Sequence, residues 1–130
     1  IDTDFPMFRL ADIYLMYAEA VLRGGSGGDV ATAVGYINQL RERAYNDASG
    51  NIAAGDLTLE FILDERGREL YWEGHRRTDL IRYNEFTENG VWPWKGGVAE
   101  GMTTESFRNI LPIPFTELSV NKKLSQNSGY

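Results

Sequence analysis

The chain has 130 residues, of which 42% are hydrophobic and 25% charged, and its formal net charge is −6. This composition predicts one globular domain with an ordinary core, and no run approaches the roughly 20 apolar residues that a membrane-spanning helix needs. Cysteine is absent and His75 is the single histidine, which argues against disulfides, thiolate chemistry and a zinc site, while the acidic balance argues against nucleic-acid binding.

Two amphipathic helices are predicted in the first part of the chain. Apolar residues recur at steps of three and four over residues 7–23 and again over 30–44. Asp4 and Pro6 mark the start of the first helix, and Asp29 is the expected N-cap of the second. Because only a short glycine-rich loop joins the two, they predict an antiparallel helix hairpin.

A second pair of helices is predicted after an aperiodic, polar loop at residues 45–56. Thr58 is the expected N-cap of a third helix that reaches about Glu73, and a short fourth helix follows over 75–83. Gly67 lies inside the third helix, where glycine costs about 1 kcal/mol relative to alanine. We therefore expect another backbone to pack closely there.

The rest of the chain, residues 84–130, predicts mostly irregular structure. Two prolines within 110–114 remove amide donors and predict an extended strap over the helices, followed by one short turn at 115–118. The polar C-terminus is expected to fray unless Leu124 and Tyr130 pin it. The sequence thus predicts one all-α domain over 1–130, helical over 1–83 and irregular over 84–130, with helix hairpins in series as in repeat-type scaffolds.

The densest cluster of charges lies between Glu60 and Arg82, with six acids and five arginines. Glu65, Glu69 and Glu73 fall at four-residue steps, and two of them could be the acid and nucleophile of a glycosidase, whose carboxyl groups lie about 5 to 10 Å apart. We favour a structural ion-pair network, because arginine offers a planar bidentate fork for tying helices together. The predicted members are Glu65, Arg66, Arg68, Glu69, Glu73, Arg76, Arg77, Asp79 and Arg82.

His75 could act as a general base, since its ordinary pKa lies near neutrality. It has no serine or cysteine partner in a recognisable nucleophile motif, and we interpret it as a capping or hydrogen-bonding group. Arg41 and Arg43 are similarly interpreted as ties between helices. The sequence therefore predicts no catalytic residue.

Trp92, Trp94 and Lys95 form the best candidate for a binding site, because they lie in a loop flanked by glycine. Flat indole rings can stack on a sugar ring while a lysine donates hydrogen bonds to its hydroxyl groups. In the alternative interpretation, which we favour on general grounds, the two tryptophans only anchor the loop to the core. Trp72 is expected in the core.

Four blocks occur in order along the sequence. They are FRLADIYLMYAEA at 8–20; Asn38, Arg41, Arg43 and Ala44; the LDER, EL and EGHRRTDLIR runs within 63–82; and Ile113 and Pro114 with Glu117, Asn121, Gln126, Asn127, Gly129 and Tyr130. Together they resemble SusD/RagB-type nutrient-binding lipoproteins over nearly the whole chain. Lys122, Lys123 and Ser128 depart from the pattern, at positions that affect turns.

The resemblance implies a tetratricopeptide-like, mostly helical fold, of which this chain is similar to the C-terminal portion. The chain opens at Ile1 without a start methionine or signal peptide, and we expect it to be a piece of a longer protein. Family members carry a lipid anchor on their N-terminal part, lie on the bacterial outer membrane and cap a SusC-like TonB-dependent transporter.

The implied function is non-catalytic binding of a glycan, an oligosaccharide, for nutrient uptake, with no cofactor. Two alternatives remain open, namely binding of a peptide and a helical module that docks on the transporter without its own ligand. An enzyme acting on polysaccharide is a third possibility and is motivated only by the three glutamates. Because helices of the isolated chain lack neighbours, we expect exposed apolar patches and self-association.

Overall fold

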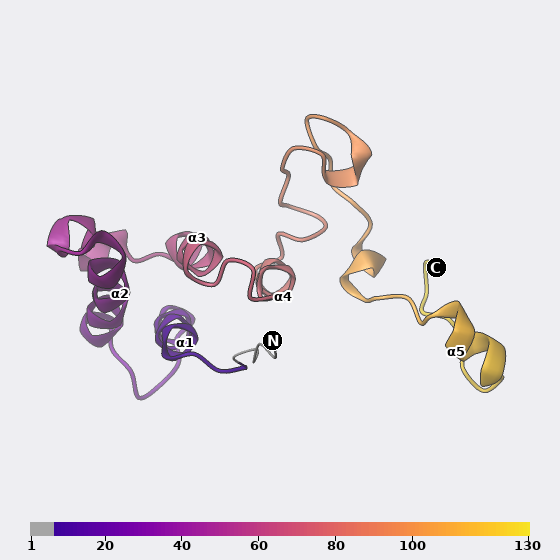
Figure 1. The fold of residues 1–130 in the computed structure, drawn as a ribbon, viewed down its shortest axis with the longest axis horizontal. Coiled ribbons are helices and arrows are strands. Elements are labelled where there is room, and N and C mark those ends of the chain that lie inside the picture. Colours follow the sequence, from indigo (N-terminus) through magenta and orange to yellow (C-terminus); the bar gives the residue numbers. More distant parts are fainter. Residues whose placement is uncertain (1–6) are drawn as a thin grey trace, which may run out of the picture. The chain divides into compact units, whose positions relative to one another are not determined.

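The computed structural model describes residues 7–130, which contain helices and loops but no strand. This confirms the predicted all-α class. The chain divides into two compact units, Ile1–Arg76 and Arg77–Tyr130, called unit 1 and unit 2 below (Figure 1). The α-helices are α1 (Leu10–Leu22), α2 (Val30–Tyr45), α3 (Leu59–Glu69), α4 (Arg76–Arg82) and α5 (Phe115–Val120). The assignment of residues 1–130 to a single domain stays a prediction.

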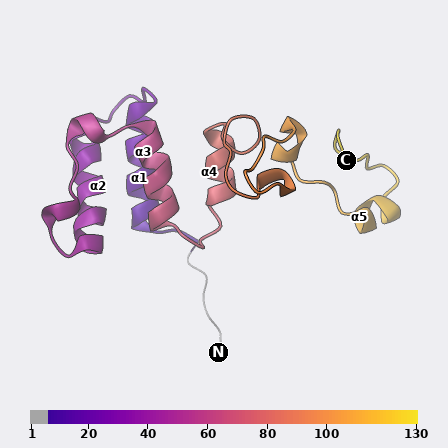
Figure 2. The same ribbon diagram turned by 90° about the horizontal axis from the view of Figure 1, so that it is seen from above.

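Three helices build the core of unit 1. Helix α1 packs against both α2 and α3 (Figure 2). Small residues at the contact let the helix backbones approach closely, and larger aliphatic side chains fill the remaining space. The buried cluster consists of Ala11, Leu15, Ala18, Ala33, Ile37, Leu40, Leu57, Ile62 and Leu70.

An aromatic group closes the predicted hairpin of α1 and α2. The rings of Tyr14 and Tyr36 stack with their centroids 4.3 Å apart, and Tyr17 meets Tyr36 edge to face at 5.1 Å. The hydroxyl of Tyr17 also accepts a hydrogen bond from the amide of Asp29 at 3.2 Å. The ring contacts hold α1 and α2 together, and the hydrogen bond to Asp29 fixes the end of the glycine-rich connector at the start of α2.

Two of the predicted helix starts are confirmed by their caps. The Asp29 carboxylate accepts from the Thr32 amide at 2.8 Å at the start of α2, and the Thr58 hydroxyl accepts from the Phe61 amide at 3.1 Å at the start of α3. Each cap satisfies one amide that has no partner inside the helix. The proposed start signals of the first helix, Asp4 and Pro6, lie outside the described residues.

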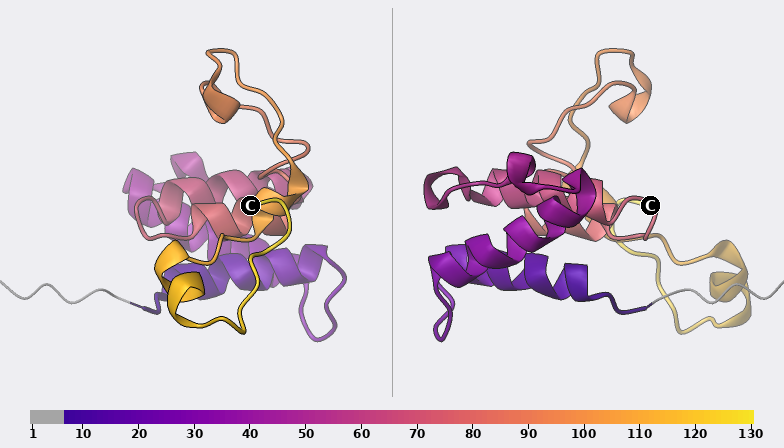
Figure 3. Two further views of the ribbon diagram at one scale, coloured as in Figure 1. Left: turned by 90° about the vertical axis from the view of Figure 1, so that its right-hand side faces the viewer. Right: turned by 60° about the vertical axis from the view of Figure 1, so that its left-hand side comes forward.

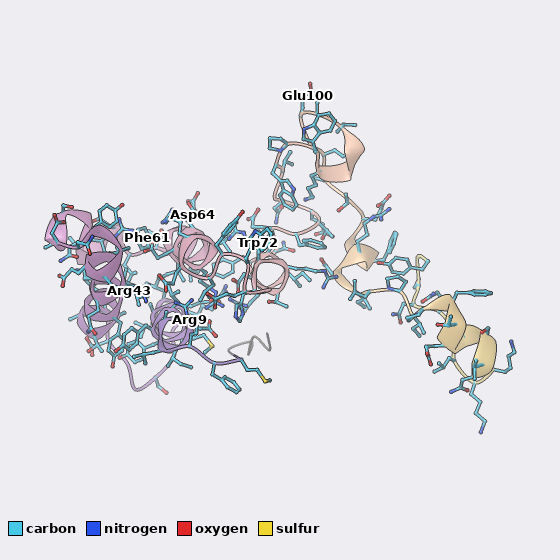
Figure 4. All side chains as sticks on the ribbon, in the orientation of Figure 1. Arg9, Arg43, Phe61, Asp64, Trp72 and Glu100 are labelled. Atoms are coloured by element: carbon cyan, nitrogen blue, oxygen red, sulfur yellow. The ribbon has the colours of Figure 1, made fainter. Side chains whose placement is uncertain are left out.

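The predicted end of the third helix is wrong. Helix α3 ends at Glu69, four residues before the expected Glu73: the backbone leaves the helical conformation at Leu70, with φ of −106° and ψ of 28°, and turns left-handed at Trp72, with φ of 65°. The prediction that Trp72 lies in the core is also wrong, since the residue is 87% exposed (Figure 4). A residue in the left-handed conformation cannot continue a right-handed α-helix. The apolar pattern of the sequence therefore extends past the last residue of the helix.

Gly67 is crowded by a side chain and not, as predicted, by another backbone. A Cβ atom at Gly67 would lie 3.1 Å from Nη1 of Arg76. That nitrogen donates a 2.7 Å hydrogen bond to the carbonyl of Leu63. The glycine therefore leaves room for a guanidinium that satisfies a carbonyl of α3.

The predicted loop at residues 45–56 is more ordered than its composition indicates. It contains two 3₁₀ turns, Ala48–Gly50 and Ala54–Asp56. The side-chain amide of Asn38 donates to the carbonyl of Ile52 at 3.1 Å and accepts from its amide at 2.9 Å. A side chain of α2 thus pairs with both backbone groups of one loop residue, which fixes the loop without any apolar period.

One side of α1 remains uncovered within unit 1. Leu10, Ile13 and Met16 recur at three-residue steps and are exposed, as are Met7 and Phe8 before the helix. This is the kind of apolar patch that the sequence predicted for the isolated chain. None of the helices within residues 7–130 is long and apolar enough to cross a membrane.

Unit 2 is mostly irregular, as predicted. Residues 84–105 leave and return as one loop (Figure 3), which is closed by a 3.1 Å hydrogen bond from the amide of Thr104 to the carbonyl of Thr87. Two 3₁₀ turns, Lys95–Gly97 and Ser106–Asn109, interrupt the irregular chain. The predicted turn at 115–118 is longer than expected and forms α5.

The extended segment 110–114 contacts the C-terminus of the chain. The Gln126 side chain donates to the carbonyl of Ile113 at 2.9 Å and accepts from its amide at 2.8 Å, and the Tyr130 hydroxyl donates to the carbonyl of Ile110 at 2.7 Å. Leu124 is exposed and does not act as the expected pin. Of the two residues named in the sequence analysis, Tyr130 therefore holds the C-terminus, and Gln126 does so in place of Leu124.

Candidate functional site

The predicted binding loop is a tight, self-contained structure within unit 2. The amide of Lys95 donates to the carbonyl of Trp92 at 3.1 Å, and the amide of Met102 returns to the carbonyl of Lys95 at 3.1 Å. Gly96 has a φ of +70°, and a Cβ atom there would lie 2.3 Å from Cγ of Met102. Only glycine meets both requirements, so the sequence at this position fixes the shape of the loop.

Lys95 holds this loop together from inside. The residue is only 6% exposed, and its Nζ donates to the carbonyl of Thr87 at 3.0 Å and to the carbonyl of Gly90. The same ammonium group lies 4.5 Å from the centre of the Trp92 ring. A buried ammonium needs such partners because the charge is costly to remove from water.

The three predicted binding residues do not share one surface. Trp92 is 37% exposed and, together with Lys95, lines a hollow of about 360 Å³. Trp94 has a left-handed φ of 68°, is 71% exposed and does not line this hollow. The hollow is bounded by Arg77, Phe86, Trp92, Lys95, Gly96, Thr104, Arg108, Leu111 and Tyr130. Glu100 lies near the tip of the same loop (Figure 4).

Several residues that line the hollow were not predicted from the sequence. Arg77 was assigned to the ion-pair network, but its Nη2 donates to the carbonyls of Arg108 and Asn109 at 3.0 and 3.1 Å, and its guanidinium lies over the Phe86 ring at 5.0 Å. Tyr130 was expected only to pin the C-terminus. Its position in the wall depends on contacts over 20 residues along the chain, which no local pattern indicates.

The third basic residue of the wall, Arg108, has an acidic neighbour outside the hollow. Its Nε donates to the Glu105 carboxylate at 3.0 Å, and both side chains are exposed. This hydrogen bond holds the pKa of Glu105 below its usual range. An exposed pair of this kind contributes little to stability and is easily screened by salt.

The glutamates proposed as a glycosidase pair are held by arginines of unit 1. Glu69 contacts Arg9 at 2.8 Å and Arg43 at 2.5 Å, and Glu73 pairs with the same Arg9. Glu65 accepts from Arg41 at 2.9 Å and from Arg68 at 2.8 Å. Figure 4 marks Arg9, just before α1, and Arg43 on α2. The three carboxylates therefore link α3 and the turn after it to the other two helices.

The remaining predicted network members divide into two kinds. Arg66 pairs with Asp12 of α1 at 2.8 Å, and Asp79 pairs with Arg82 at 2.8 Å within α4. Arg76 and Arg77 instead donate to backbone carbonyls. His75 is partly buried directly before α4. No group of three or more histidine and carboxylate side chains within residues 7–130 is arranged to hold a metal ion.

Comparison of the sequence with known proteins shows its family. The family model described as "SusD family" matches residues 1–130. The chain is 45% identical over 130 residues to "Starch-binding protein SusD" of Bacteroides thetaiotaomicron, covering 99% of this chain and 22% of that protein. It is 35% identical to "SusD-like protein P38" of Formosa agariphila, over 99% of this chain and 25% of the relative.

A further relative, "SusD-like protein P25" of Formosa agariphila, is 37% identical over 95% of this chain and 24% of its own length. The chain thus spans about a quarter or less of the curated relatives it matches. The match to the family model nevertheless extends over all of its residues, in agreement with the four ordered sequence blocks. The chain belongs to the SusD family.

Proposed function

We propose that the chain is part of a non-catalytic glycan-binding protein that serves nutrient uptake at the bacterial outer membrane. The observation that carries the proposal is the 45% identity, over 99% of this chain, to a protein named for starch binding. The hollow in unit 2 supports it, because one wall is an indole ring and another carries hydrogen-bond donors. Sugar sites commonly combine a flat apolar face with a few placed polar groups.

The proposal includes a mechanism of binding. Trp92 supplies an indole face for a sugar ring, and Thr104 supplies a hydroxyl group to the same hollow. Lys95 acts mainly by keeping the loop folded, because its ammonium already donates to two backbone carbonyls. Trp94, which is exposed outside the hollow, extends the surface for further units of an oligosaccharide.

No chemistry on the glycan is part of the proposal. A glycosidase needs two carboxyl groups that face the scissile bond from opposite sides. Arginines contact at least one oxygen of each of Glu65, Glu69 and Glu73. These residues are therefore assigned to the scaffold.

The partner and the location follow from the family resemblance. The protein that contains this chain would be held on the cell surface by a lipid anchor on its N-terminal part, where it would cap a SusC-like TonB-dependent transporter. Glycan captured at the surface would then pass to the transporter. Recovery of such a transporter from detergent extracts with the tagged full-length protein would support this assignment.

The test of glycan binding is calorimetric titration of the full-length protein with maltoheptaose. We expect measurable binding that weakens about three- to tenfold in Trp92→Ala, the range given by the loss of one aromatic stacking contact. Trp72→Ala is the matched control, because it removes an exposed tryptophan of unit 1. Absence of binding to any neutral or acidic oligosaccharide would overturn the proposed function, and equal affinities for all three proteins would overturn the site.

A polysaccharide panel tests the non-catalytic role separately. We expect no new reducing ends after prolonged incubation with the full-length protein. Release of product that disappears in Glu69→Gln would show that the protein is an enzyme.

A further inference from the structure

The hollow in unit 2 has a charge opposite to that of the chain. The whole chain carries a formal charge of −6, yet the lining residues include Arg77, Lys95 and Arg108 and no aspartate or glutamate. Within the described part of the chain, Lys95 contacts carbonyl groups and an indole ring and no carboxylate. Its positive charge therefore adds to the potential inside the hollow.

Part of the Arg77 guanidinium, in the wall of the hollow, is available to a ligand. Arg77 uses Nη2 for its two backbone hydrogen bonds, and its guanidinium plane is held over the Phe86 ring at 5.0 Å. Among residues 7–130, no hydrogen bond from its Nε or Nη1 occurs in the structure. A guanidinium that is fixed in position and retains donors at Nε and Nη1 can bind a carboxylate through a charge-assisted hydrogen bond.

We propose that this hollow binds an acidic sugar, a hexuronic acid unit of an oligosaccharide. The sugar ring lies against Trp92, its carboxylate is bound by Arg77, and Lys95 contributes positive potential. Arg108 contributes less, because its charge is partly offset by Glu105. This inference rests on the proposed glycan-binding function and narrows it to a charged ligand class, whereas starch, named for the relative, is uncharged.

The walls favour a sugar over a simple anion or an acidic peptide. Phe86, Trp92 and Tyr130 supply aromatic surface that a sulfate or acetate ion cannot cover. Thr104, a hydroxyl-bearing residue, also lines the hollow, and a sugar offers hydroxyl groups that an aspartate side chain lacks. The volume of about 360 Å³ lies at the lower end of the range for small-molecule sites, so one or two sugar units fit.

The experiment compares trigalacturonic acid with its fully methyl-esterified form, because esterification removes the charge and keeps the same rings and linkages. Both are titrated into the full-length protein by calorimetry. We expect the acid to bind about ten times more tightly than the ester in low salt, since a hydrogen-bonded charge pair contributes on this scale. The preference should fall as salt is added, because these charges are partly exposed.

Arg77→Gln should reduce the acid-to-ester preference to about twofold or less, while ester binding stays within about threefold. Because Arg77 also donates to backbone carbonyls, a second variant is needed at a residue whose side chain makes no backbone hydrogen bond in the described residues, and Arg108 meets this condition. Arg108→Gln should lower the acid-to-ester preference about threefold. Lys122→Gln, at an exposed residue outside the lining set, is the matched control and should retain the full preference.

Each outcome separates this inference from the proposed function. Equal binding of acid and ester by the wild-type protein, or a preference retained in both arginine variants, would overturn the charged site while leaving glycan binding intact. Binding of tri-aspartate as tight as that of trigalacturonic acid would overturn the assignment to a sugar. Failure of every oligosaccharide to bind would overturn the proposed function itself.

Discussion

Replacing Glu65 by glutamine tests whether the carboxylates of unit 1 are structural. Glu65 lies on α3 with a side chain that is only 8% exposed, and its Oε2 lies 2.9 Å from Nη1 of Arg41 and 2.8 Å from Nη2 of Arg68. The Arg41 side chain is 14% exposed, whereas that of Arg68 is 56% exposed. The pair with Arg41 therefore dominates the energetic effect.

The size of the effect follows from burial. Removing one partner of a buried ion pair costs about 3–5 kcal/mol because the other charge remains buried, and an exposed pair contributes less than about 1 kcal/mol. Glutamine keeps an oxygen that can accept from Arg41, so we expect the free energy of unfolding to fall by about 3 kcal/mol, the lower end of that range.

Urea denaturation of the dilute chain, followed by circular dichroism, measures this change. Asp64→Asn is the control, because Asp64 is an exposed carboxylate on the same helix (Figure 4), and it should shift the free energy of unfolding by less than about 0.5 kcal/mol. Equal stability of the wild-type chain and both variants would refute the structural role of Glu65. A stable Glu65→Gln variant that also lost release of sugars from polysaccharide would support the enzyme hypothesis instead.

Three further predictions address the cap, the core and the exposed face of unit 1. The Thr32 amide, and to a smaller extent the Thr32 hydroxyl, donates to Asp29 and holds the pKa of its carboxyl below the usual range. The stability that the cap contributes is therefore complete above the ordinary carboxyl pKa and is lost as the pH falls through the lowered pKa of Asp29. The stability difference between the wild-type chain and Asp29→Ala, measured by urea denaturation over an acid pH series, should therefore vanish at low pH, and a constant difference would contradict the cap. Ile37→Ala should lower the free energy of unfolding by about 2–5 kcal/mol in the same assay, because the residue is fully buried; a loss below about 1 kcal/mol would mean that the core closes around the gap. The isolated chain should self-associate in sedimentation velocity, and Ile13→Lys combined with Met16→Lys should reduce this, since both side chains are exposed on α1; unchanged association would place the contact elsewhere.

Helix starts were predictable because the chemistry that fixes them is local. Asp29 and Thr58 each sit directly before an apolar period, and each cap bond spans only three residues. The end of α3 was not predictable in this way. Leu70, Tyr71 and Trp72 continue the apolar run, but the backbone turns left-handed at Trp72, and an apolar pattern does not report a backbone angle.

The candidate site was predictable only in part. The Trp92–Lys95 segment was identified by its aromatic residues and its glycine neighbours, yet the two tryptophans face different surroundings. Because lysine is rarely buried, the residues around Lys95 in the sequence do not indicate that its side chain supports the loop from inside. Arg77 and Tyr130 join the same hollow from positions more than 50 residues apart, which makes it a product of tertiary structure.

The two units are stabilised by different interactions, and this bears on where a ligand can act. All buried hydrophobic residues within 7–130 belong to unit 1, whereas the buried residues of unit 2 are Asp79, Thr87 and Lys95. Unit 2 therefore depends more on hydrogen bonds, both within the backbone and from side chains to backbone, each of which contributes only about 1 kcal/mol net. A ligand that binds only the folded state adds to stability by mass action. In a unit with little apolar burial, the ligand supplies a larger fraction of the total stability. Unit 1 has the packing expected of a scaffold, and the glycan that we propose for unit 2 would stabilise the hollow that it occupies.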